Sequence, residues 1–164
     1  GGGGGGGGGG PVVLTASKDG SAAASALLEH GALAAARRLR EPHGGRVVRG
    51  VRGRDASVLA TVGDDGACAV HDLRLPPGAE RVASFEGLHS GLQANCVEWS
   101  PAEEWRLLTA GADPHVRVLD LRAPQGGPAL TLSGHVSPAA ARGGRLRGIY
   151  RPAFAGGGAP AGTP

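Results

Sequence analysis

The sequence contains no methionine and few aromatic residues. Among its 164 residues, Phe, Trp and Tyr together make up 3%. With so few large rings, any hydrophobic core must rest on Ala, Val and Leu, and such a core would be thin if the chain stood alone. Because the chain starts with Gly and has no Met, we expect it to be an internal stretch or a processed product of a longer protein.

Cysteine and long apolar runs are also scarce. The two cysteines, Cys68 and Cys96, lie far apart and form no Cys-x-x-Cys motif. This usage predicts buried thiols in a reducing compartment, cytoplasmic or nuclear, rather than a disulfide framework or a zinc site. No apolar run reaches 18 residues, so the sequence predicts no membrane span, and no signal peptide is visible.

The positive charge is almost entirely arginine. Lys18 is the one lysine among 17 basic residues, and the net charge is +3. Together with abundant Ala and Gly, this bias is typical of a GC-rich coding sequence, so the arginine content alone is weak support for nucleic acid binding. Seven arginines within 18 residues still allow a phosphate-binding patch as an alternative to a solvated face. They are Arg37, Arg38, Arg40, Arg46, Arg49, Arg52 and Arg54.

The most informative feature is an internal repeat of 46 to 48 residues. Three windows align without a gap: VLTASKDGSAAASA from Val13, LATVGDDGACAVHD from Leu59, and LLTAGADPHVRVLD from Leu107. Each window carries a Thr followed four residues later by an Asp. Histidines recur at a similar spacing, in PHGG, GLHS and SGHV, at positions 43, 89 and 135.

Each window has the pattern of a β-hairpin. In the middle window an apolar stretch, Val58–Val62, is followed by a cluster of small and acidic residues and by an alternating stretch over 67–73. Further strands are expected at 95–99, 106–110, 116–121 and 129–132. Four short antiparallel strands per repeat are typical of a blade of a β-propeller. The predicted fold is therefore all-β, a partial β-propeller of about three blades.

The repeat resembles the WD-repeat family, whose units carry Gly-His near the start and Trp-Asp near the end. Gly134 and His135 supply the first dipeptide, whereas His71 and Leu119 stand where the family has Trp. The resemblance covers about residues 12–150. Since propellers usually close with four to eight blades, we expect the remaining blades to lie outside this chain, or the chain not to fold stably alone.

The resemblance divides the chain into blades. The opening glycines have no side chains to bury, and we interpret them as a flexible lead, an expression scar or a placeholder for unidentified residues. Residues 27–40 have Ala and Leu at helical spacing, but the family pattern makes them the last turn and strand of the first blade. The expected units are a Gly-rich lead over 1–11, a partial blade over 12–42, blades over 43–88 and 89–134, and over 135–164 the start of a further blade with a Gly/Pro-rich tail.

In that family a hydrogen-bond chain links the His, the turn Asp, a Ser or Thr on the second strand and the Trp on the third. The resemblance implies a structural, non-catalytic network of seven residues: His43, Thr61, Asp65, His89, Thr109, Asp113 and His135. A buried Asp needs donors, which an imidazole N–H and turn amides supply. His71 could join as donor or acceptor, whereas Leu119 cannot.

Both later windows end in Asp-Leu-Arg, with Asp72 and Arg74 in one and Asp120 and Arg122 in the other. This ending looks like the DWD box of substrate receptors that dock on the damaged-DNA-binding adaptor of cullin-RING ubiquitin ligases. The resemblance makes these four residues candidates for partner binding, with each Arg as a charged fork on the rim. We expect both arginines on the same side of neighbouring blades, free of intramolecular carboxylates.

A second resemblance leaves the function open. The segment NCVEWSPAEEWRLLTAGADPHVRVLDLR, from Asn95, is similar to a blade of the nucleosome-remodelling histone-binding WD proteins. It implies a chromatin-associated protein that binds histones or DNA, as an alternative to the ligase receptor.

Enzyme chemistry is not indicated. The sequence has no phosphate-cradling glycine loop, no nucleophile elbow and no paired metal-ligand spacing. We therefore expect no catalytic residue, cofactor or metal, and predict a non-catalytic scaffold for protein partners.

Overall fold

The computed structural model describes residues 11–134 and 148–154, and over these residues the chain is all-β. The first sheet contains β1 (Val12–Ala16), β2 (Ala22–Ala26) and β3 (Arg37–Leu39). The second contains β4 (Val48–Gly53), β5 (Val58–Gly63), β6 (Cys68–Asp72) and β7 (Arg81–Phe85). The third contains β8 (Ala94–Trp99), β9 (Arg106–Gly111), β10 (Val116–Asp120) and β11 (Leu130–Leu132), with a short 3₁₀ helix, η1 (Pro124–Gly126), before β11.

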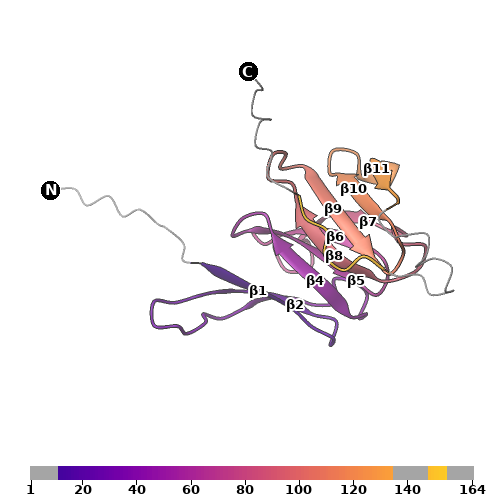
Figure 1. Cartoon of the computed structure of the whole chain (residues 1–164). Coiled ribbons are helices and arrows are strands. Elements are labelled where there is room, and N and C mark those ends of the chain that lie inside the picture. The colour runs from indigo at the N-terminus through magenta and orange to yellow at the C-terminus, as the bar shows by residue number, and fades with distance from the viewer. Residues whose placement is uncertain (1–10, 135–147, 155–164) are drawn as a thin grey trace, which may run out of the picture.

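The three sheets are blades, which we call the first, middle and third. In each, the strands pair antiparallel in chain order, so each sheet is an up-and-down meander. β4 and β5 of the middle blade lie against β8 of the third blade. β1 of the first blade lies against β4. Figure 1 shows the blades following one another, from β1 and β2 at one end to β10 and β11 at the other. The all-β, partial β-propeller fold predicted from the sequence is confirmed.

The first blade is shorter than the other two. The repeat aligns Val13 of β1 with Leu59 of β5 and Leu107 of β9, which are the second strands of their blades. Over the described residues, the first blade therefore has no counterpart of β4 or β8. Residues 1–10 and His135 lie outside the described residues.

Over the described residues the core has three hydrophobic clusters, two of them between successive blades and the third where Leu108 packs with Ile149 and Phe154. β5 is buried along its whole length because it is covered on both faces. Leu59 packs towards the first blade, in a cluster with Leu39 and Val51. Val62 packs towards the third blade, in a larger cluster that contains Trp99. Small residues such as Ala60, which is fully buried, let the sheets approach closely, so few aromatic residues suffice.

The predicted hairpins are present at the predicted places, as β5–β6 and β9–β10. The strand expected over 129–132 is β11, whose three residues are exposed. In the stretch from 27 to 40 the chain is not helical: Leu27 and Leu33 form an isolated bridge, and β3 follows. The turn between Leu27 and Leu33 passes through Gly31, whose φ of 78° lies in the left-handed region that favours glycine.

Trp99 joins the middle and third blades, so its removal should be costly. Its side chain is buried, and its indole N–H donates to the carbonyl oxygen of Arg52 on β4 at 3.0 Å. We expect Trp99→Ala to lower the free energy of unfolding in urea by about 3 to 5 kcal/mol. Tyr150→Ala, at a residue 74% exposed, should change it by less than about 0.5 kcal/mol. Equal midpoints for the two variants would contradict this role of Trp99.

Candidate functional site

Two equivalent clusters of polar side chains lie where each hairpin meets the loop that enters its blade. In the middle blade, His43 comes from the loop between β3 and β4, and Asp65 from the turn between β5 and β6. His43 Nδ1 lies 2.9 Å from both carboxylate oxygens of Asp65. In the third blade, His89 Nδ1 lies 2.8 Å from Asp113 Oδ1. Each histidine thus ties the loop between two blades to a turn of the blade that follows.

The chemistry of the groups gives these hydrogen bonds a direction. A carboxylate can only accept, so Nδ1 of each ring donates to its aspartate. His43 Nε2 lies 3.0 Å from the hydroxyl oxygen of Thr61, and His89 Nε2 lies 3.3 Å from that of Thr109. Each imidazole therefore bridges a threonine hydroxyl on the second strand and the aspartate of the turn.

His71 extends this chain in the middle blade. Its Nε2 lies 3.1 Å from the hydroxyl oxygen of Thr61. His71 thus takes the place in the network that the WD-repeat resemblance assigns to Trp. Its Nδ1 is buried with no partner among the described residues. Burial lowers the pKa of His71 to about 4, with Arg81 adding to the effect, so the ring is neutral near pH 7.

In the third blade, the position equivalent to His71 holds Leu119, which is buried and has no polar group to offer. Arg117, which the sequence analysis did not identify, joins the cluster instead. Arg117 on β10 points into the cluster, with Nη2 2.7 Å from Asp113 Oδ2 and Nη1 3.1 Å from Oδ1. Burial alone would raise the pKa of Asp113, but hydrogen bonds from Arg117 and His89 lower it below its ordinary value. Arg117 itself is only 7% exposed.

Glycine makes room for both imidazole rings. A Cβ on Gly63 would lie 2.7 Å from Cγ of His43, and a Cβ on Gly111 would lie 2.7 Å from Cγ of His89. These contacts are closer than real Cβ atoms allow. The Thr-x-Gly pattern shared by the two windows therefore positions the histidine, with Thr beside the ring and Gly beneath it.

The four residues predicted to bind partners lie at the other end of the same strands. Asp72 ends β6 and Asp120 ends β10, and each is followed two residues later by its arginine. Arg74 and Arg122 are 68% and 61% exposed at the side chain. Their side chains occupy equivalent positions on neighbouring blades.

The expectation that these arginines are free of intramolecular carboxylates is wrong. Arg74 donates from Nε to Asp72 Oδ1 at 2.8 Å and from Nη2 to Oδ2 at 2.6 Å, and Arg122 binds Asp120 in the same way. The hydrogen bonds from the arginines lower the pKa of each aspartate to about 2. Arg122 also stacks on Trp105, 4.8 Å from the ring centroid. The Asp-x-Arg spacing therefore forms a bidentate ion pair, which we call the fork, and not a free cation.

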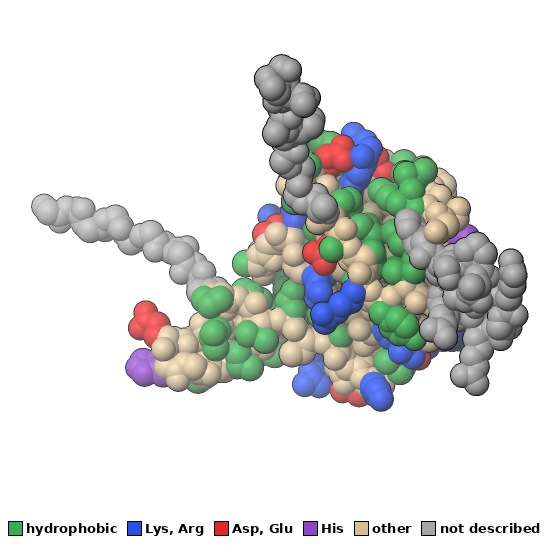
Figure 2. All heavy atoms as spheres, in the orientation of Figure 1, with side chains coloured by type: hydrophobic (Ala, Val, Ile, Leu, Met, Phe, Trp, Pro, Cys, Tyr) green, Lys and Arg blue, Asp and Glu red, His purple; other side chains and the backbone are tan. Residues whose placement is uncertain are grey.

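The arginines of the 37–54 stretch are partly neutralised. Arg49 pairs with Asp64, and Arg52 pairs with Glu98 at 3.1 Å. Arg54 pairs with Asp55 at 3.1 Å. Figure 2 shows the same mixture on the face in view, where blue side chains are scattered among red ones and form no single basic patch.

Neither cysteine is an activated nucleophile. Cys68 is fully buried, and burial raises the pKa of its thiol to about 12. Burial also raises the pKa of Cys96. In the described residues, no group of three or more His, Cys, Asp or Glu side chains is placed to hold a metal ion. The same part of the chain contains no helix of the length and apolarity needed to cross a membrane.

The glycine beneath His89 provides a test of the cluster. An added Cβ at Gly111 would collide with the backbone carbonyl oxygen of Gln93 as well as with the ring of His89, so we expect Gly111→Ala to lower the free energy of unfolding by about 1 to 3 kcal/mol. Gly126→Ala, where an added Cβ would meet nothing within 4 Å, is the matched control and should have little effect. Thermal or urea unfolding of both variants makes the comparison. A Gly111→Ala protein as stable as the control would show that the ring does not need this space.

The buried neutral state of His71 predicts a pH dependence of stability. Because its pKa falls from 6.5 in the unfolded chain to about 4 in the folded one, its contribution is complete above about pH 6.5 and declines as pH falls towards 4. The loss at the acid end is about 3 kcal/mol. His71→Gln keeps an N–H donor but does not titrate. Urea unfolding from pH 7 to 4 should therefore show a shallower decline for the variant, and parallel curves would contradict the prediction.

Comparison with known proteins supports the architecture. No protein-family model matches the chain. A chain in the crystal structure of the Mitotic Checkpoint Complex is similar to it with a TM-score of 0.60 and 19% sequence identity. The match covers 76% of this chain and 34% of that one, so this chain spans about a third of its structural neighbour. Since 537 chains of solved structures match, the likeness establishes the propeller-like fold and does not single out a function.

Proposed function

We propose that this chain is part of a WD-repeat propeller that acts as a non-catalytic platform for protein partners. The observation that carries the proposal is the repeated fork at the ends of β6 and β10. Arg74 and Arg122 stand at equivalent positions of neighbouring blades, largely exposed, each bonded to its own aspartate. A side chain that is already paired before binding loses less conformational entropy when a partner docks.

The pairing with aspartate changes how such a surface would act. The bonds to aspartate use Nε and one Nη2 hydrogen of each guanidinium, so the remaining N–H groups, those of Nη1 and the second of Nη2, are the donors left for a partner. Each fork presents a nearly neutral ion pair rather than a bare positive charge. The partner surface that fits it offers carbonyl oxygens or single carboxylates at the blade spacing, not a dense acidic patch.

Within this platform, we propose the adaptor of a cullin-RING ubiquitin ligase as the partner of the Asp-Leu-Arg endings, on the strength of the DWD-box resemblance. The alternative from the sequence, a chromatin-associated role with histones or DNA, gains no further support from the described residues. The arginines between 37 and 54, three of which pair with carboxylates, likewise add nothing to a nucleic acid role.

The test is capture of the ligase adaptor by the purified protein. Reversal of both forks, Arg74→Glu and Arg122→Glu, places like charges two residues apart and should reduce capture more than tenfold. The control is Arg38→Glu with Arg46→Glu, which changes the net charge equally at exposed arginines and should leave capture unchanged. Capture is normalised to folded protein.

The outcomes separate the finer proposal from the broader one. Loss of capture in the first double variant and not in the second supports the ligase receptor. No capture by the unmodified protein removes the ligase proposal. Equal capture by the protein and both variants shows that the forks do not form the docking surface.

A further inference from the structure

The two hairpins differ at the two positions that face the turn aspartate. Alignment of the windows pairs Ala67 with His115 and Ala69 with Arg117. In the third blade the long side chain of Arg117 fills the space beside Asp113. In the middle blade two methyl groups take the place of these side chains, and a cavity of about 380 Å³ opens beside Asp65.

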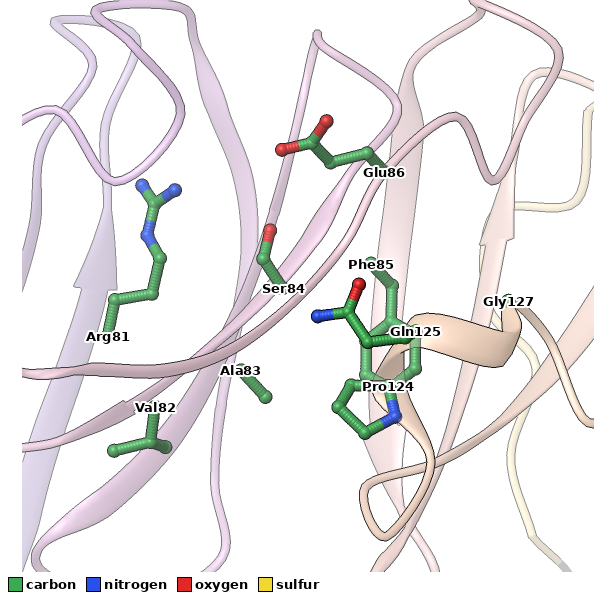
Figure 3. A pocket seen from close by; sticks show the side chains of 9 residues that line it. All are labelled: Arg81, Val82, Ala83, Ser84, Phe85, Glu86, Pro124, Gln125 and Gly127. Carbon is green, nitrogen blue, oxygen red and sulfur yellow. The ribbon is translucent and has the colours of Figure 1, made fainter.

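This cavity, which we call the Asp65 cavity, has polar walls. Its lining includes Asp65 and His43 at one side and Arg81, Ser84 and Glu86 on the outer strand. Figure 3 shows that Arg81, Ser84 and Glu86 rise on the same side of the β7 ribbon, where they also border a second hollow towards η1. The Asp65 cavity is thus continuous with the outer edge of the blade and reachable from solvent.

The carboxylate of Asp65 is more exposed than that of Asp113 and lacks its guanidinium partner. It accepts from His43 and from the backbone amide of Ala67 at 3.0 Å, and among the described residues its one ion-pairing partner is the imidazole. Its side chain is 26% exposed, against 5% for Asp113. In the third blade, the guanidinium of Arg117 pairs with the negative charge of Asp113.

We propose that the Asp65 cavity binds the guanidinium group of an arginine supplied by a partner protein, in the place that Arg117 occupies in the third blade. The inference deepens the proposed function as a protein platform, since it names the chemistry of a partner. A planar guanidinium fits better than a lysine ammonium because its fork reaches both oxygens of one carboxylate at once. The turn that carries Asp65 precedes β6 and Arg74 follows it, so the two surfaces lie at opposite ends of the blade.

The charges around the cavity leave room for one cation. Arg81 lies at its wall, but its Nη2 donates to the carbonyl oxygen of Pro42 rather than to Asp65. Asp65 and Glu86 together outweigh that positive charge by one. Replacing Arg81 with Gln should therefore tighten binding of a guanidinium several-fold.

The binding test uses a defined peptide. ¹⁵N-labelled protein is titrated with acetyl-Gly-Arg-Gly-amide, and the backbone amide of Ala67, which donates to Asp65, reports occupancy. We expect a saturable shift of this amide at millimolar peptide. The matched lysine peptide should bind at least about fivefold more weakly.

Two variants test whether the peptide binds in the Asp65 cavity. Ala69→Arg puts an intramolecular guanidinium where the peptide binds and should abolish the saturable shift. Asp65→Asn keeps an acceptor for His43 but removes the charge, and should weaken binding at least about tenfold. Ala102→Arg adds the same charge in an exposed loop and should leave the titration unchanged.

The result that overturns the proposal is the absence of a saturable shift in the unmodified protein, or an equal shift in Asp65→Asn. Should Ala69→Arg fail to fold, Asp65→Asn decides the question. Ala69→Arg leaves Arg74 and Arg122 in place, so adaptor capture through the forks continues in that variant. Failure of arginine binding can therefore be distinguished from failure of the platform itself.

Discussion

The structure depends on a carboxylate in a hairpin turn that is held by an imidazole from the loop before the blade. In both complete blades the loop that carries the histidine is the crossover from the preceding sheet, so the bond fixes each blade to the chain that enters it. The constraint is demanding. Nδ1 of the ring must face the carboxylate, a threonine must lie at Nε2, and a glycine must lie beneath the ring. These requirements explain why Thr, Gly and Asp recur together in the two windows.

Beyond that shared bond the blades differ, and the difference determines what each can do. In the middle blade, His71 bonds to Thr61, and the small side chains of Ala67 and Ala69 leave the space beside Asp65 open. In the third blade, Leu119 seals the core and Arg117 closes the turn. One scaffold therefore produces a filled site and an open one without a change of backbone path, which is why the open site is the one we assign to a partner.

Much of the fold could be predicted from the sequence, because hairpins depend on local spacing. The Thr-to-Asp interval and the alternating stretches after it specified β5–β6 and β9–β10. Arg117 was missed because an arginine inside an alternating strand reads as a solvent-facing residue. The position equivalent to Arg117 in the middle window holds Ala69, and this difference between the windows is the signal that could have identified Arg117. The forks were misjudged for a different reason, since the Asp-x-Arg spacing already allows one carboxylate to hold the arginine two residues later.

The measurement that tests this account most directly is a double-mutant cycle on His89 and Asp113. His89→Ala, Asp113→Ala and the double variant are compared with the unmodified protein by urea unfolding. If the imidazole–carboxylate bond joins loop to blade, the two substitutions are coupled by about 1 to 3 kcal/mol. The same cycle on the pair of Asp72 and Arg74, whose arginine is largely exposed, should give a weaker coupling. Additive effects at His89 and Asp113 would contradict the central claim, because they would show that the bond between the two side chains adds nothing to the free energy of unfolding.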